Sequence, residues 1–242
     1  MSTVFDSLRL ALESNPLVAL ATVVGGRNAG TKLLVWPDGQ FQGDLGGTSL
    51  NQLVLDSAIG LLSEQKTGRR AFEIEREATD VFIEVFPPPP RLIIVGAVHI
   101  TIPLVRFASE LGFDTTVVDA RSAFATPERF AHADHLILQW PDDALAELEL
   151  DEGCYIAILS HDDKLDVPAL RVALESKARY IGALGSRKTM AGRMETLREM
   201  GISAEQLGRV HNPIGLNLGG RKPEEIALAI MAEIVAVRNG QR

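Results

Sequence analysis

The sequence predicts an α/β protein with a small N-terminal α/β domain and a larger C-terminal domain built on a doubly wound parallel sheet. Four consecutive prolines at 87–90 divide the chain, because proline fits neither helix interiors nor central strands. After them, short apolar runs alternate with helical patterns almost to the end, which is typical of a parallel sheet covered on both faces. We therefore expect domains at 1–86 and 91–242, joined by an extended proline linker at 87–90.

Composition and charge narrow the class of protein. Hydrophobic residues make up 46% of the 242 residues and charged residues 23%, as in ordinary folded proteins. The net charge of -8 disfavours a nucleic-acid partner. No apolar run approaches the ~20 residues of a membrane helix, and the N-terminus lacks the pattern of a signal peptide, so we expect a cytoplasmic protein without membrane contact.

A single cysteine, Cys154, excludes an internal disulfide and any multi-cysteine metal site. It stands at the head of the apolar segment CYIAIL, which favours a buried small side chain over a nucleophile.

The first domain contains elements of both kinds. Phe5, Leu8 and Leu12 recur on one face of a short helix, which Asn15 and Pro16 should end. The pattern then predicts a buried strand, two strands paired through a two-residue turn at Asp38 and Gly39, a helix and a closing strand, at 18–24, 31–37, 40–45, 50–61 and 81–86.

The second domain alternates more regularly. A helix with Ile100, Leu104, Ala108 and Leu111 on one face should end at Gly112. The last helix begins at Pro223, carries acidic residues in its first turn and ends near 238–240. The predicted strands are LIIVG, TTVVD, HLILQ, YIAIL and RYIGAL.

The loop after the first of these strands has the layout of a Rossmann phosphate loop. Gly96 occupies the first glycine position, but Val98 stands where the second glycine lets backbone approach a pyrophosphate. Asp119 follows at close to the ~20-residue offset expected for a ribose contact, and Arg121 could pair with a 2′-phosphate. The alternative is that Asp119 caps a turn and Arg121 is a surface charge. The domain is thus Rossmann-like, with NAD(P) binding weakened by Val98.

The segment SHDDKLD, from Ser160 to Asp166, follows a predicted strand and should lie at the carboxyl edge of the sheet, where open α/β folds bind ligands. An imidazole side chain suits proton transfer or anion contact, which makes His161 a candidate, and Asp162 could fix its tautomer. The alternative is that Asp162 or Asp163 caps the next helix and His161 is only a turn residue.

The segment IGALGSRK is predicted to end a further strand and to begin a helix. Free N–H groups and the side chains of Arg187 and Lys188 suit a phosphate or other oxyanion at Ser186, although a solvated helix start would look similar. A constrained loop from Asn212 precedes the last helix and could either line a pocket or be a tight connection.

Taken together, these motifs resemble one family, the xanthine dehydrogenase accessory factors of the XdhC/CoxI type. The resemblance rests, in order, on GAVHITIPLVRFASELGFDTTVVDAR, Arg129 with Phe130, SHDDK, YIGALGSRKT and PIGLNLGGRKPEEIALAIMAEI. It covers residues 91–237. The first half matches only in part, at Arg27, Gly30, Lys32, Asp38, Gly39, Gly43, Gly46 and Gly47.

The resemblance implies a maturation factor that binds molybdenum cofactor and helps deliver it, in sulfurated form, to the apo-enzyme of a molybdenum hydroxylase. We assign no catalytic residue and no metal ligand. The candidate cofactor-binding residues are Arg27, Gly96, His99, Asp119, Arg121, His161, Asp162, Gly185, Ser186, Arg187, Lys188, Pro213 and Gly215.

The chain departs from the family pattern at five candidate ligand positions: Thr48, Ser49, Asn51, Val98 and Asn217. Two other hypotheses therefore stay open, a nicotinamide-dependent oxidoreductase and a degenerate partner protein that acts through protein contacts alone. We expect a homodimer, since two-fold dimers are the commonest soluble oligomers.

Overall fold

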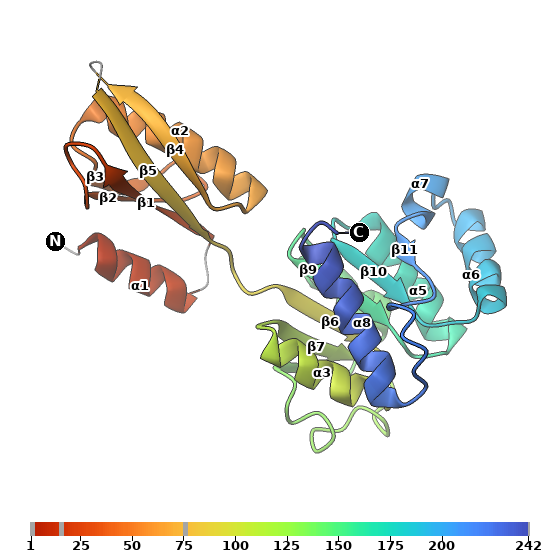
Figure 1. The fold of residues 1–242 in the computed structure, drawn as a ribbon. Helices are drawn as coiled ribbons and strands as arrows, with labels where there is room; N and C mark the ends of the chain where they lie inside the picture. The colour runs from red at the N-terminus through yellow and green to blue at the C-terminus, as the bar shows by residue number, and fades with distance from the viewer. Residues whose placement is uncertain (1–2, 15–16, 75–76, 242) are drawn as a thin grey trace. The chain divides into compact units, whose positions relative to one another are not determined.

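The computed structural model describes residues 3–14, 17–74 and 77–241, and the chain divides into two compact units, Met1–Pro88 and Pro89–Arg242. Each unit has its own sheet and its own core (Figure 1).

The first unit is a five-stranded antiparallel sheet with the strand order β3-β2-β1-β5-β4. Its elements are α1 (Val4–Ser14), β1 (Val18–Gly25), β2 (Lys32–Val35), β3 (Phe41–Asp44), α2 (Thr48–Glu64), β4 (Gly68–Ile74) and β5 (Glu77–Phe86). Helix α2 buries Val54, Ala58 and Leu62 against one face of the sheet, and α1 packs through Leu8 and Ala11 on β1 and β2.

Several expectations for this unit need correction. Helix α1 buries Leu8 and Ala11, whereas Phe5 is 70% exposed. The face that the helix buries is therefore rotated from the predicted face. The hairpin loop is longer than two residues, because Trp36 and Gln40 close it through a backbone hydrogen bond. Strand β4 was missed, and β5, which contains the predicted closing strand at 81–86, lies between β1 and β4. Asn15 and Pro16 lie outside the described residues.

The second unit confirms the predicted Rossmann-like α/β class. Its six strands are all parallel, in the order β11-β10-β9-β6-β7-β8. The strands and helices are β6 (Arg91–Val95), α3 (Thr101–Glu110), β7 (Asp114–Val118), β8 (His135–Ile137), α4 (Pro141–Glu147), β9 (Cys154–Ile158), α5 (Asp163–Glu175), β10 (Tyr180–Ala183), α6 (Arg187–Glu199), α7 (Ala204–Leu207), β11 (Val210–His211) and α8 (Pro223–Arg238). The order reverses between β6 and β9, which makes their carboxyl ends the topological switch point.

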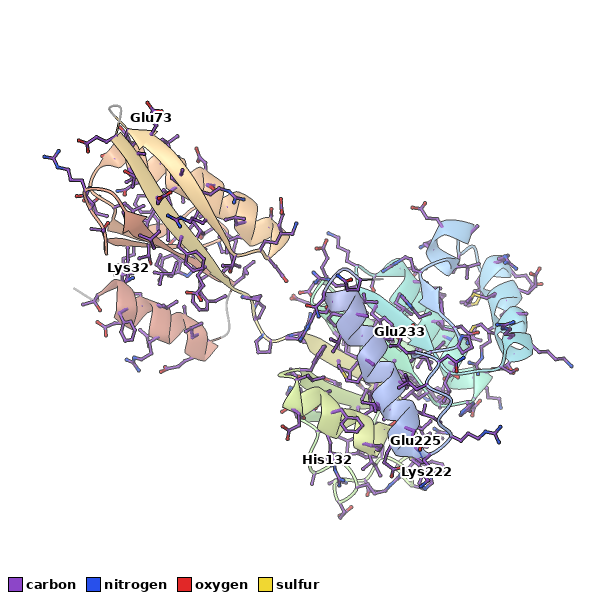
Figure 2. The ribbon with its side chains drawn as sticks, in the orientation of Figure 1. Lys32, Glu73, His132, Lys222, Glu225 and Glu233 are labelled. Carbon is purple, nitrogen blue, oxygen red and sulfur yellow. The ribbon has the colours of Figure 1, made fainter. Side chains whose placement is uncertain are left out.

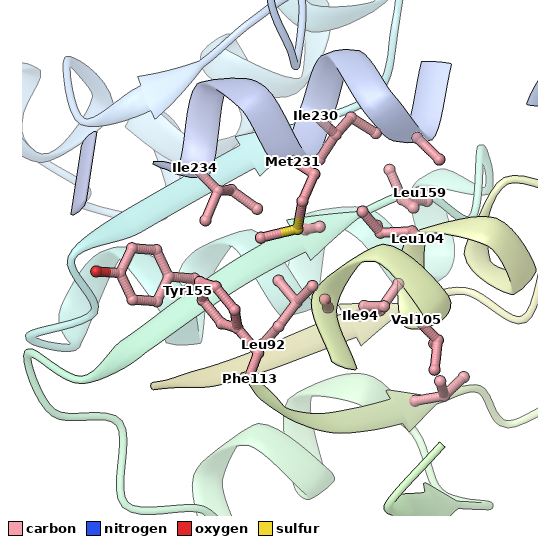
Figure 3. Close-up of a cluster of buried hydrophobic side chains, with 14 of the residues drawn as sticks. Leu92, Ile94, Leu104, Val105, Phe113, Tyr155, Leu159, Ile230, Met231 and Ile234 are labelled. Carbon is pink, nitrogen blue, oxygen red and sulfur yellow. The ribbon is translucent and has the colours of Figure 1, made fainter. Parts of the chain in front are cut away.

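Helices cover both faces of this sheet. Helices α3 and α8 share one core cluster with the strands, and Ile230, Met231 and Ile234 of α8 reach down toward Leu92 and Tyr155 (Figure 3). Helices α4, α5 and α6 pack on the opposite face of the sheet. They form a second core cluster with strand residues such as Ile93, Val95 and Ile156. The continuous burial of β6 and β9 explains why both strands have unbroken apolar sequences.

The remaining differences in this unit are at element ends. Helix α3 begins at Thr101 rather than Ile100, and Leu111 lies past its last turn and is 42% exposed. Strand β8 covers only His135–Ile137, and the two-residue strand β11 was not predicted. Cys154 is fully buried as expected, and burial raises the pKa of its thiol to about 11. Across the described ranges, no helix has the length and apolar character needed to span a bilayer.

Candidate functional site

The predicted ligand residues of the second unit all fall in loops, or at the start of α6, at one edge of its sheet. Because the strands are parallel, the loops after β6, β7, β9, β10 and β11 emerge at the same carboxyl edge. They carry in turn Gly96 and His99, Asp119 and Arg121, His161 and Asp162, Gly185 to Lys188, and Pro213 and Gly215.

Gly96 and the loop after β9 meet closely at the switch point. Gly96 has a φ of +112°, and a Cβ on it would lie 2.7 Å from the backbone nitrogen of Ser160. This residue must therefore be glycine for the two loops to pack. Val98 is half-buried against the core, and His99 is exposed.

Asp119 and Arg121 satisfy each other. The buried Asp119 carboxylate accepts from Ala97 N at 2.8 Å and from Arg121 N, Nε and Nη2 at 2.9, 2.9 and 2.7 Å. Burial opposes ionisation of Asp119, but these hydrogen bonds outweigh it and lower its pKa. The Arg121 guanidinium also lies 4.7 Å from the centre of the Phe124 ring. A ribose hydroxyl or a 2′-phosphate would have to compete with these contacts, so the structure gives the nucleotide role no added support.

His161 has an unusual backbone at the end of β9. Its φ of +62° lies in the left-handed region, which costs a residue other than glycine of order 1–3 kcal/mol and is typically held by surrounding contacts at functional sites. The His161 side chain is exposed. Asp162 takes the capping role, since its carboxylate accepts from Lys164 N at 3.0 Å.

A buried polar network lies beneath this turn, and sequence reasoning missed it. Ser160 Oγ donates to Asp166 Oδ1 at 2.5 Å, and Asp166 Oδ2 lies 2.8 Å from Arg193 Nη2 of α6. Burial raises the pKa of Asp166 despite the neighbouring Ser160 hydroxyl and Arg193 guanidinium. Asp166 does lie on the apolar stripe of its helix with Ala169, Leu170 and Ala173, and that misplaced charge was the available signal.

The start of α6 presents two exposed cations. Ser186 caps the helix by accepting from Thr189 N at 3.1 Å, and Asn212 Nδ2 anchors the preceding loop through Ala183 O and Gly185 O at 3.0 and 3.2 Å. Arg187 and Lys188 are exposed, and neither forms an ion pair with another described residue.

These two cations line different cavities. Arg187 contributes to a cavity of about 900 Å³ formed with the loop after β11 and the first turns of α8, which also includes Arg221 and Asn217. Lys188 lines a separate cavity of about 690 Å³ between α5 and α6. That both side chains serve one anion stays a prediction.

The floor of the larger cavity is built on a buried carboxylate. This residue is Glu233 of α8, which is labelled in Figure 2. Its carboxylate accepts from Tyr180 OH and from Gly215 N, each at 2.7 Å. Burial opposes ionisation of Glu233, but His211, the Tyr180 hydroxyl and the Gly215 N–H outweigh it and lower its pKa to about 2. Gly215 has a φ of +89°, and a Cβ there would lie 2.9 Å from Ile230 N.

The cavity mouth is shaped at the start of α8. Lys222 and Glu225 lie together there (Figure 2), and the Glu225 carboxylate accepts from the backbone N–H groups of Arg221 and Lys222 at 2.8 and 3.0 Å. The loop that presents the Arg221 side chain is thus pinned to the helix by Glu225.

The candidate residues of the first unit gather at two adjacent loops. The exposed Arg27 stands next to Asn28, whose side chain fills the space over Gly46. Asn51 binds the loop before α2, since it donates to Asp44 Oδ1 at 3.0 Å and accepts from Leu45 N at 2.8 Å. Asn51, at which the chain departs from the family pattern, thus has structural partners in its own loop.

Within the described ranges, no three His, Cys, Asp or Glu side chains are grouped so that they could hold a metal ion. The carboxylates at the sheet edge, such as Asp119, Asp162 and Glu225, accept hydrogen bonds from within the chain. The exposed cations, amides and backbone N–H groups beside them suit an anionic organic ligand.

Comparison with known protein families gives two matches that together span most of the chain. The model of the XdhC Rossmann domain matches residues 92–234, and the model of the XdhC and CoxI family matches residues 11–73.

Three curated relatives align with the chain. The uncharacterised protein YqeB of Escherichia coli K12 is 30% identical over 94% of this chain and 44% of its own length. A protein of Bacillus subtilis, named as a probable xanthine dehydrogenase subunit, is 32% identical over 67% of this chain and 47% of its own. The molybdenum cofactor insertion chaperone PaoD of Escherichia coli K12 is 30% identical over 50% of this chain and 37% of its own. The chain thus spans less than half the length of each.

A solved structure described as a xanthine dehydrogenase from Bacillus halodurans superimposes with a TM-score of 0.58. It covers 100% of this chain and 97% of its own, at 20% identity, and so supports the fold alone.

Proposed function

The chain belongs to the XdhC and CoxI family, and from this membership we propose that it is an accessory factor of a molybdenum hydroxylase, which binds molybdenum cofactor and helps deliver it to the apo-enzyme. One relative is named a molybdenum cofactor insertion chaperone and another a probable xanthine dehydrogenase subunit, which supports an accessory role in this class of enzyme.

The observation that carries the proposal is the convergence of the family motifs on one sheet edge beside a cavity of about 900 Å³. A phosphate-bearing pterin is a large polar anion, and Arg187 and Arg221 of this cavity supply two guanidinium groups that can pair with phosphate. In this proposal the phosphate end lies between these arginines, and His161 at the switch point is near the reactive end of the ligand.

We further propose that the two compact units correspond to the two family domains and that the factor works as a cytoplasmic homodimer. The oxidoreductase alternative depends on Gly96 and Asp119. Contacts within the chain account for both residues, which leaves the chaperone function better supported.

The test is to purify the protein from a host that makes molybdenum cofactor and identify the small molecules released on denaturation by mass spectrometry. We expect molybdopterin at near-stoichiometric yield. Arg187→Ala should reduce the yield about tenfold, the scale of losing one charge-assisted contact to phosphate. The matched control is Arg198→Ala, at the far end of the same helix in a surface pair with Glu195, which should retain the ligand.

Other outcomes would contradict the proposal. An NAD(P) mass would favour the oxidoreductase. A protein that carries no ligand, and whose deletion leaves molybdenum hydroxylases fully active, would favour a scaffold acting through protein contacts.

A further inference from the structure

Arg193, at the end of the second turn of α6, connects segments that come from three different parts of the second unit. Its side chain is 2% exposed. Nε lies 2.7 Å from Asp163 Oδ1, Nη2 lies 2.8 Å from Asp166 Oδ2, and Nη1 donates to Leu184 O at 3.1 Å. One planar group therefore binds the start of α5 and the end of β10 at the same time.

The first branch of this network reaches the His161 turn. Asp166 accepts from Ser160 Oγ at 2.5 Å, and the same hydroxyl accepts from Asp162 N at 3.2 Å. The residues on both sides of His161 are thus tied to Asp166, and through it to Arg193. This explains what holds His161 in the left-handed region.

The second branch reaches the start of α6. Leu184 immediately precedes Gly185, and a Cβ on Gly185 would lie 3.6 Å from Arg193 Nη1. Arg193 lies about two turns after Ser186 on the same helix, so the contacts that hold Arg193 also hold the helix whose first turn carries Arg187 and Lys188.

Stability alone is a poor reason for this arrangement. Buried ion pairs are often no more stabilising than apolar residues of similar volume, because both charges lose their hydration. Two carboxylates share one guanidinium here, and α5 and α6 already make apolar contacts in the same core. What the network adds is geometry, since the rigid fork of arginine fixes several partners in one plane.

We propose that Arg193 is a positioning residue that holds the His161 turn and the Ser186 helix start in one fixed relation, so that a single ligand can contact both. The identity of the ligand rests on the proposed function, but the spatial coupling of the two loops does not.

Amide hydrogen exchange without ligand tests the coupling. In Arg193→Gln we expect the amides of Asp162, Lys164 and Thr189 to exchange about tenfold faster, all together, while the amides of β6 and β7 stay protected. Arg193→Lys keeps the charge but not the fork, and it should rescue thermal stability while both loops still exchange faster.

Arg209 offers a matched control in the same unit. It donates to the carbonyls of Leu174, Ser176 and Ala178, just before β10 and therefore at the opposite edge of the sheet. Arg209→Lys should leave exchange at Asp162, Lys164 and Thr189 unchanged. Faster exchange at only one of the two loops, uniform loss of protection across the sheet, or full rescue by Arg193→Lys would each overturn the positioning role.

The amount of ligand that the protein retains tests whether the positioning role of Arg193 matters for binding. The yield of molybdopterin released from purified Arg193→Lys should fall about tenfold although its melting temperature stays close to that of the parent protein. If the parent protein releases no molybdopterin, the proposed function fails, and the exchange experiment still decides whether Arg193 couples the loops.

Discussion

Asp166 and Glu233 are two buried carboxylates below the same edge of one sheet, yet their surroundings drive their protonation in opposite directions. Both are nearly inaccessible, at 0% and 2% exposure. Burial raises the pKa of Asp166, whereas His211, Tyr180 and the Gly215 N–H overcome burial and lower the pKa of Glu233 to about 2.

The difference lies in the donors. Glu233 Oε2 receives two hydrogen bonds of 2.7 Å, from a phenol and a backbone N–H. Asp166 Oδ2 has Arg193 Nη2 at 2.8 Å but receives no well-directed hydrogen bond among the described residues. The comparison shows that the number and direction of donors, rather than burial, decide whether a buried carboxylate stabilises its site as an anion.

The largest expected effect is that of removing Glu233. Glu233→Ala takes away the acceptor of Tyr180 OH and Gly215 N and opens a cavity, which should lower the free energy of unfolding by about 4 kcal/mol. Glu233→Gln, which keeps the shape and one acceptor oxygen, should lose roughly half as much. Urea unfolding at pH 7 measures both, and equal losses in the two variants would mean that charge alone matters.

The next largest effect should be a fall in the free energy of unfolding at acid pH. The folded pKa of Glu233, about 2, lies below its ordinary value of 4.5, so its contribution is fully present above pH 4.5 and is lost as the pH falls toward 2. The linked loss is of order 3 kcal/mol. It is measured as the difference in unfolding free energy between the parent protein and Glu233→Gln across this range, and a difference that does not change with pH would contradict it.

The smallest effect should come from Asp166→Asn. Asparagine keeps an oxygen for Ser160 and removes the cost of burying an anion. It loses the ion pair with Arg193, but that guanidinium keeps Asp163 and Leu184 O as partners and is not left unpaired, so we expect a change under about 1 kcal/mol at pH 7. A raised folded pKa means that the ionised form weakens the fold, and protonation relieves this as the pH falls through the folded pKa toward 3.8.

Asp163→Asn is the control for that experiment. It removes the exposed carboxylate partner of Arg193 and should leave unchanged the gain in stability that protonation of Asp166 gives as the pH falls. If Asp166→Asn lowered stability as strongly as Glu233→Ala, the contrast between the two carboxylates would disappear.

The parallel half of the fold was predictable because fully buried strands give unbroken apolar sequences, as in CYIAIL and RLIIV. Strand β4 was not, because Arg69, Arg70 and Glu73 lie on an exposed edge strand and interrupt the alternation. The rotated face of α1 has a similar cause, since Leu8 packs with the small Ala11 while the larger Phe5 remains in solvent.

The candidate loops could be located from sequence because parallel strands bring their carboxyl ends together. Their supports could not, because Arg193 meets Asp163 across 30 positions and Tyr180 meets Glu233 across 53. The charged members of these networks lie inside helices, where charge ordinarily indicates the solvent face. The position of Asp166 on the apolar stripe of α5 was a sequence signal, whereas only tertiary packing shows that Arg193 and Glu233 point inward.

Cys154 gives the second unit an internal reporter of its own opening. The thiol has no solvent exposure at the start of a central strand, and its pKa of about 11 leaves little thiolate at neutral pH. An alkylating reagent will therefore label it only in molecules whose sheet has transiently separated. Because the chain has no other cysteine, the labelling rate reports the opening kinetics of that one sheet without any engineered probe.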